Sequence, residues 1–358
     1  MDLTFEANGF ANVNGATYLG GGPNARAPQY YDQLLLLRVD VRNVDRGFMF
    51  MQQRGIFVVD ATIRSIANAV YGGAQQSATL GGSFTQLVAI DAGNGLYRSG
   101  DPSKLVIANN DLIGAQYFRQ HMKLHSAAEF GVTSRYFIIS DNRFAASSIP
   151  TAPGSAGDVW WLEIGPANAS ETELMEDFIV ERNWFTGNGV VSRYVYMNES
   201  KGTIRNNLFD FTRGDPNNQN WAVSIFQFGA GVPAPDDIQV YNNTAYSSAT
   251  NTNSQGFAMV MVDEAGRGAT NIVIRNNYAS MPNYINKVMV IDPFSRATVS
   301  NNTLTNTPGW VSATPSVPAD FKPAAGSAAI GTGTVVPVWS DFFGVPQPTP
   351  RDLGAVNH

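Results

Sequence analysis

The chain has 358 residues, of which 44% are hydrophobic and only 15% are charged, so it can bury a large core without the Glu- and Lys-rich surface of a helical protein. A net charge of −6 and the lack of any Lys/Arg run argue against nucleic-acid binding, and the absence of cysteine excludes disulfides and zinc–thiolate centres. No apolar stretch approaches the roughly 20 residues of a membrane span.

Short apolar runs occur in the first third of the chain, at residues 34–41, 56–63 and 87–90. A sequence typical of a β-strand also follows Met1 directly. Many glycines and asparagines separate such runs, as is typical of short strands joined by turns. We therefore expect these segments to begin a β-structure. No signal peptide is recognisable in this sequence.

A six-residue phrase with Asn at its fourth position then recurs at intervals of 24 to 41 residues. The copies are Ile107–Leu112, Ile139–Phe144, Val180–Phe185, Ile204–Phe209, Val240–Ala245, Ile274–Ala279 and Val299–Leu304. Asn tolerates the left-handed backbone region and bonds its own backbone, so it suits a bend between two strands. Stacked coils of a solenoid would align these amides into a ladder, with Asn110, Asn142, Asn183, Asn207, Asn243, Asn277 and Asn302 near one corner.

A second apolar strand accompanies each phrase, at residues 122–124, 160–164, 195–197, 223–225, 258–262 and 288–290. No helical period competes with these runs. The pattern predicts an all-β fold in which residues 1–307 form a parallel β-helix, continuous over about 34–304. Eight of the 19 prolines fall after residue 307, so we expect 308–358 to be an irregular tail packed on the coils. That tail should bury Trp310, Trp339, Phe342 and Phe343.

Several stretches resemble known β-helix proteins. The Asn coils resemble the pectate-lyase-like superfamily of right-handed parallel β-helix proteins. The text LVIANN at 105–110, KLHS at 123–126, YFIISDNRF at 136–144 and the ending FFG…PRDLGA at 342–355 resembles a group of predicted secreted bacterial proteins of that fold. The resemblance covers roughly residues 85–358. It implies a right-handed parallel β-helix that is secreted, periplasmic or at the cell surface.

Characterised members of that superfamily are mostly polysaccharide lyases, glycosidases, epimerases, esterases and phage tailspikes, so the resemblance implies a polysaccharide partner. Their catalytic signatures, such as W-I-D-H and R-x-P-x-x-R, are absent from this sequence. The resemblance therefore implies a fold and a class of ligand, and the reaction must be argued from individual residues.

One outer face of the coils gathers candidate catalytic residues. On a strand, side chains alternate between two faces, so His121, Lys123 and His125 share one side while their apolar neighbours point inward. By the same alternation, the following coils should expose Trp161, Glu163, Tyr194, Tyr196 and Asn198 beside them. Aromatic rings and charged groups on one surface are typical of a sugar-binding site.

A lyase that cleaves an acidic polysaccharide by β-elimination is the function that this cluster favours. The reaction needs a base to remove the proton α to a uronate carboxylate, and a cation to neutralise that carboxylate. We expect the base among Lys123, His125, His121 and Tyr196, because neighbouring cations lower a lysine pKa. The expected substrate-binding residues are Arg98, Arg135, Trp161, Glu163, Tyr194 and Asn198, with Ca²⁺ a plausible cofactor.

Two alternatives remain open on the sequence. A glycoside hydrolase of the same fold would need two carboxylates about 5–10 Å apart. The pairs that could supply them are Asp210/Asp215, Asp236/Asp237 and Asp263/Glu264. A non-catalytic glycan-binding or structural β-helix would need neither arrangement. The sequence does not indicate the oligomeric state.

Overall fold

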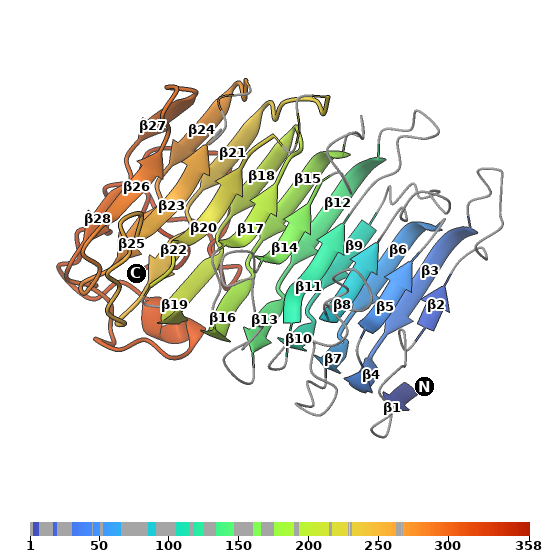
Figure 1. Ribbon diagram of the computed structural model, residues 1–358. Coiled ribbons are helices and arrows are strands. Elements are labelled where there is room, and N and C mark those ends of the chain that lie inside the picture. The colour runs from blue at the N-terminus through green and yellow to red at the C-terminus, as the bar shows by residue number, and fades with distance from the viewer. Residues whose placement is uncertain are drawn as a thin grey trace.

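A computed structural model gives the three-dimensional arrangement of the chain. It describes residues 3–6, 17–19, 31–44, 46–50, 53–65, 85–90, 105–114, 118–124, 134–146, 160–165, 175–189, 193–214, 217–227, 229, 231–262, 266 and 268–358. These residues wind into successive coils that stack along one axis, with the N-terminal strands at one end and the C-terminal strands at the other (Figure 1).

Three parallel sheets form the walls of the coils. Sheet A has ten strands: β1 (Leu3–Glu6), β4 (Val39–Val44), β7 (Thr62–Ser65), β10 (Asp111–Gly114), β13 (Arg143–Ala146), β16 (Trp184–Gly189), β19 (Leu208–Gly214), β22 (Thr244–Tyr246), β25 (Tyr278–Ser280) and β28 (Thr303–Thr305). Sheet B has nine: β2 (Thr17–Leu19), β5 (Arg46–Phe50), β8 (Thr85–Ile90), β11 (Phe118–Leu124), β14 (Trp160–Ile164), β17 (Arg193–Met197), β20 (Asn220–Ile225), β23 (Phe257–Val262) and β26 (Lys287–Ile291).

Sheet C has nine strands as well: β3 (Tyr31–Leu37), β6 (Gln53–Val59), β9 (Leu105–Ala108), β12 (Ser134–Ser140), β15 (Met175–Glu181), β18 (Gly202–Arg205), β21 (Ile238–Tyr241), β24 (Ile272–Arg275) and β27 (Ala297–Ser300). The chain passes through sheets C, A and B in turn, and each strand pairs in parallel with the strand three places later. This is the right-handed parallel β-helix that the sequence predicts. Its coils begin before residue 34, because β1 and β2 already pair with β4 and β5.

The interior of the coils holds one continuous hydrophobic core. The last position of the six-residue phrase points into it, and the rings of Phe144, Phe185 and Phe209 stack there with centroids 4.5 and 5.0 Å apart. Among the described residues the only helical element is the short 3₁₀ turn η3 (Pro318–Phe321), and none could cross a membrane as a helix.

The asparagine ladder is confirmed. Each ladder Asn after Asn110 accepts hydrogen bonds at Oδ1 from the backbone N–H and the Nδ2 group of the ladder Asn one coil before it. The same pattern continues through Asn207, Asn243 and Asn277 to Asn302. The bend itself differs from the prediction. The left-handed residue is the one before the ladder Asn, such as Asn206 with φ of 54°, and the ladder Asn supplies the hydrogen bonds.

The C-terminal tail lies along the outside of the coils. Trp310, Phe321 and Leu353 pack on Tyr246 and Tyr278 of sheet A in a second hydrophobic cluster. Farther along, Val336 and Val338 form a third cluster with Tyr241 of sheet C. Burial of Trp310 is confirmed, and Phe342 is partly buried. The prediction was wrong for Trp339 and Phe343, which are 80% and 51% exposed. The division of the chain at residue 307 stays a prediction.

Replacing Trp310 by alanine should lower the free energy of unfolding by about 2–3 kcal/mol, because its ring is covered on several sides by Tyr246, Tyr278 and Phe321. Trp339→Ala is the matched control, since it removes the same side chain from an exposed position of the same tail. Chemical denaturation of both variants checks this. Equal losses in the two variants would contradict the packing described for the tail.

Candidate functional site

Sheet B aligns three of the predicted residues in one row across neighbouring coils. Lys123 of β11 pairs with Glu163 of β14, and Glu163 pairs with Tyr196 of β17. The row continues to Ser224 of β20. We call Lys123, Glu163, Tyr196 and Ser224 the sheet B row. The stacking of these residues that the sequence predicts is therefore confirmed, whereas their role is a separate question.

Two residues expected beside this row point into the core instead. Trp161 and Tyr194 are 0% and 1% exposed, and their rings contact each other edge to face at 4.8 Å. Both they and the next residue in each strand belong to the core cluster, so the strict alternation of faces is interrupted here. Burial raises the pKa of Tyr194 well above its usual value, and its hydroxyl donates to the Asp210 carbonyl. The predicted position of Trp161 and Tyr194 on an outer face was wrong.

Three members of the row, Glu163, Tyr196 and Ser224, are buried. Glu163 and Tyr196 are 3% and 4% exposed, and Asn198 is 2% exposed. The ring of Tyr196 contacts that of Phe226 at 4.5 Å, and Asn198 Nδ2 donates to the Pro233 carbonyl at 3.0 Å. The segment after β20 thus closes over this part of sheet B. The predicted exposure of Glu163, Tyr196 and Asn198 was wrong, because the sequence did not reveal this cover.

No described contact brings His121, His125, Arg98 or Arg135 to the row, and Lys123 is placed there by its backbone register alone. His121 and Lys123 lie in β11, but their side chains are outside the described part of the structure, as are residues His125 and Arg98 altogether. Arg135 lies on sheet C, where it forms a 2.9 Å ion pair with Glu176. It therefore belongs to a different sheet from Lys123.

Arg193 is a cation on sheet B that the sequence analysis did not single out. Its guanidinium lies 5.3 Å from the ring centroid of Tyr196 and 4.9 Å from that of Trp221. Two aromatic rings hold the group in a fixed orientation beside the row. Strict alternation would place Arg193 on the same face as the buried Val195, so no signal in the sequence indicated that it lies beside Tyr196.

A second site is an open cleft of about 680 Å³ at the corner where sheet C turns into sheet A. One wall is the coil corner and the other is the tail. The lining residues are Asp141, Asn142, Arg143, Arg182, Trp184, Pro318, Ser340, Phe342, Phe343 and Gly344. We call it the tail cleft. The sequence analysis missed it because its two walls are between 134 (Trp184 to Pro318) and 203 (Asp141 to Gly344) residues apart in the chain.

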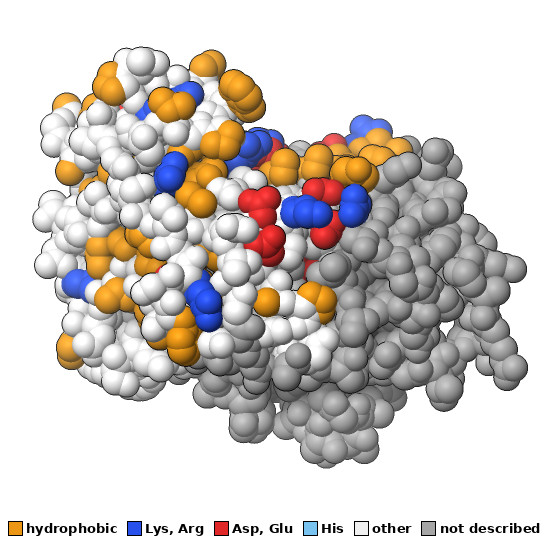
Figure 2. All heavy atoms as spheres, turned by 90° about the horizontal axis from the view of Figure 1, so that it is seen from above, with side chains coloured by type: hydrophobic (Ala, Val, Ile, Leu, Met, Phe, Trp, Pro, Cys, Tyr) orange, Lys and Arg blue, Asp and Glu red, His pale blue; other side chains and the backbone are white. Residues whose placement is uncertain are grey.

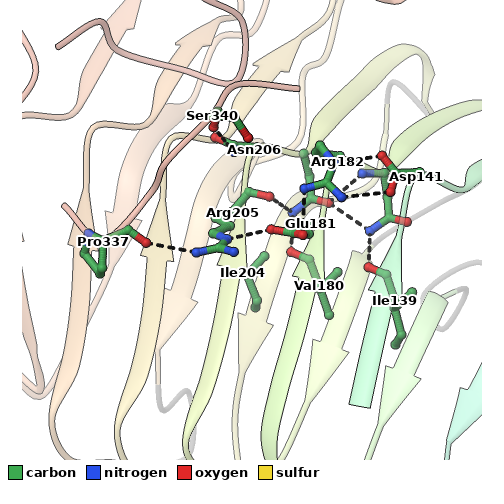
Figure 3. A network of polar contacts seen from close by, with 12 residues as sticks. Ile139, Asp141, Val180, Glu181, Arg182, Ile204, Arg205, Asn206, Pro337 and Ser340 are labelled. Atoms are coloured by element: carbon green, nitrogen blue, oxygen red, sulfur yellow. Dashed lines mark hydrogen bonds and ion pairs between the residues drawn. The ribbon is translucent and has the colours of Figure 1, made fainter. Parts of the chain in front are cut away.

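A network of ion pairs holds the corner wall of the tail cleft in place (Figure 3). Arg182 binds Asp141 through two nitrogens at 2.8 and 2.9 Å, and this bond is the main cause of a raised Arg182 pKa. Glu181, which is 8% exposed, bridges Arg182 and Arg205 at 2.6 and 2.7 Å. Figure 2 shows acidic and basic side chains gathered on one face beside hydrophobic ones.

The same network attaches the tail. Arg205 Nη1 donates to the Pro337 carbonyl at 2.9 Å, and Asn206 Nδ2 donates to the Ser340 carbonyl at 2.7 Å (Figure 3). One bond reaches the main-chain oxygen of Pro337, shortly before the lining residues, and the other reaches that of Ser340, which is itself one of them. The position of the second wall is therefore fixed by the coils.

No contact among the described residues supports the expected calcium site or the carboxylate pairs. Among the described residues, no three His, Cys, Asp or Glu side chains come together as metal ligands would. Asp236 accepts hydrogen bonds from Thr270 and Asn271 of the next coil at 2.6 and 2.8 Å, so it braces two turns. Asp215, Asp263 and Glu264 lie outside the described residues.

Comparison with known proteins yields a likeness among solved structures only. No protein-family model and no curated protein matches the chain. Among solved structures, the chain is similar to the pectate lyase Pel9A, with a TM-score of 0.46 and 12% sequence identity over 89% of this chain and 77% of that one. The parallel strand pairing of the chain itself defines it as a right-handed parallel β-helix protein.

Proposed function

We propose that the chain is a polysaccharide-active protein, and that it cleaves an acidic polysaccharide by β-elimination at the sheet B row. The observation that supports this most is the alignment of Lys123, Glu163 and Tyr196 on adjacent strands, with Arg193 next to Tyr196. Parallel strands lie about 4.8 Å apart, so such a row spans roughly the length of a sugar unit or two. A position outside the cytoplasm, implied by the resemblance, stays a prediction.

The chemistry assigns different roles to these residues. Lys123 removes the proton α to the uronate carboxylate, the electron pair forms a carbon–carbon double bond, and the glycosidic oxygen leaves from the adjacent carbon. Tyr196 protonates the departing oxygen. Arg193 neutralises the carboxylate, which is the step that makes the α-proton acidic enough to remove. Because Glu163 and Tyr196 are buried, substrate reaches the row only when Phe226 and Pro233, which lie against this part of sheet B, move aside.

The test is turnover of a panel of acidic and neutral polysaccharides, followed by ultraviolet absorbance of the unsaturated product. On the substrate that is cleaved, Lys123→Ala and Arg193→Gln should each lower turnover by about 100-fold or more, since each removes a group that acts in the transition state. Glu163→Gln should show a smaller loss. Lys322→Ala is the matched control, because it removes an exposed lysine from the tail.

Three results would change the assignment. Full activity in Lys123→Ala would remove that residue from the reaction. New reducing ends without an unsaturated product would replace the lyase by a glycoside hydrolase. Glycan binding without cleavage of any polysaccharide would make the chain a non-catalytic glycan-binding or structural β-helix.

A further inference from the structure

The tail wall of the cleft is a rigid loop that exposes an aromatic ring. The carboxylate of Asp341, which is 2% exposed, accepts backbone N–H groups from Phe343 and Val345 at 2.9 and 2.8 Å through Oδ1, and from Asn357 at 3.1 Å through Oδ2. Gly344 completes the turn with φ of 79°. The loop is thus fixed by a buried acid, and yet it leaves the Phe343 side chain half exposed. An exposed ring on a fixed loop is typical of a binding surface.

The opposite wall contributes a cation with unused donors. The guanidinium of Arg143 lies 5.4 Å from the ring centroid of Trp184, which holds it flat against the corner. Its only described polar contact is from Nη1 to Asp111 at 3.1 Å, and the side chain is 44% exposed. Five N–H donors belong to a guanidinium, so most of the planar fork is available for a carboxylate or another oxyanion.

Backbone groups of the corner are already paired. Asp141 N–H donates to the Glu181 carbonyl, Arg143 N–H to that of Asn110, and Trp184 N–H to that of Asn142. A peptide that binds by adding a strand needs unpaired backbone groups at a sheet edge. The cleft offers none at these positions. It offers instead aromatic rings, which pack against the C–H faces of sugars, and a guanidinium, which binds carboxylates.

We infer that the tail cleft binds a carboxylated saccharide unit, with Arg143 on the carboxylate and Phe343 against the sugar ring. Its volume lies within the roughly 300–1,000 Å³ usual for ligand pockets. The cleft lies at the corner between sheets C and A, whereas the sheet B row lies on the third sheet. This saccharide site is therefore separate from the proposed reaction site and would hold a polysaccharide that the row cleaves or releases.

The test uses the full chain and three probes of equal length: a galacturonate tetramer, the neutral maltotetraose, and tetraglutamate. Hydrogen exchange should slow at residues 340–346 on addition of the galacturonate tetramer only. In calorimetry, Arg143→Gln should weaken its binding by about tenfold or more, and Phe343→Ala should weaken it also. Trp339→Ala, which alters an exposed ring outside the cleft, should leave affinity unchanged.

Several outcomes would overturn this inference. Equal binding of tetraglutamate would show a site for simple carboxylates, and equal binding of maltotetraose would show that Arg143 selects nothing. Protection confined to residues 193–200 would place the saccharide at the sheet B row, which leaves the proposed reaction intact but removes the cleft site. Conversely, the inference is supported if the Lys123→Ala variant is inactive and the galacturonate tetramer still slows hydrogen exchange at residues 340–346 in it, because binding and cleavage would then occur at separate sites. Thermal melting of each variant shows that the fold is retained.

Discussion

Replacing Asn207 by alanine is expected to lower the free energy of unfolding by about 3–5 kcal/mol, although the substitution removes only an amide. Asn207 is fully buried in the middle of the ladder. Its Nδ2 group donates to the carbonyls of Val180 and Arg205 and to Asn243 Oδ1 at 2.9 to 3.0 Å. Its Oδ1 accepts two bonds from Asn183. Alanine leaves these partners buried and unpaired, at about 1–3 kcal/mol each when no water reaches them.

Asn302→Ala is the matched control for this prediction. Asn302 ends the ladder and is only partly buried, so water can replace the amide there. We expect a loss of roughly half the size or less. Denaturant unfolding of both variants measures the difference. Equal destabilisation would mean that the ladder contributes through each bend separately and gains nothing from burial between coils.

The ladder could be predicted from the sequence because it depends on a local phrase. An apolar strand, a polar pair and a second strand recur together, and stacking follows from the repeat alone. The coils that contain β4 and β7 show the limit of this rule. Val39 and Ala61 occupy the ladder position there, and Ala61 N–H donates to Asn110 Oδ1 at 2.8 Å, so the fold continues without the signature.

The candidate sites were predicted less well, for two physical reasons. Alternation assigned Trp161 and Tyr194 to the outer face, but β14 and β17 each place two successive residues in the core. A regular period does not reveal such an interruption. Arg143 and Phe343 line opposite walls of the tail cleft but lie far apart in the sequence. They come together only because of the way the tail attaches to the coils. The ending FFG…PRDLGA carried the resemblance of the tail to other β-helix proteins. In the structure its buried Asp352 accepts the N–H of Gly331 at 2.9 Å.

Replacing Gly202 should give the second large loss of stability, because the neighbouring coil leaves no space for a side chain at this position. Gly202 of β18 pairs with Phe178 of β15, whose ring is 2% exposed and belongs to the core. A Cβ atom on Gly202 would lie 1.9 Å from Phe178 Cζ. Gly202 has no positive φ, so the backbone would accept any residue and only the ring forbids one. We expect Gly202→Ala to cost about 4 kcal/mol or more, beyond the usual range for an overpacked core.

A double-mutant cycle separates this steric conflict from any other effect. Phe178→Leu alone should be destabilising, because it leaves part of the ring's volume empty. Combined with Gly202→Ala, it should cost less than the two single losses added together, since the smaller side chain makes room for the new methyl group. Thr203→Ala, at the next residue with a half-buried side chain, is the control and should change stability little. If the two single losses simply add, Phe178 does not set the requirement for glycine, and the backbone of Gly202 itself must be the cause.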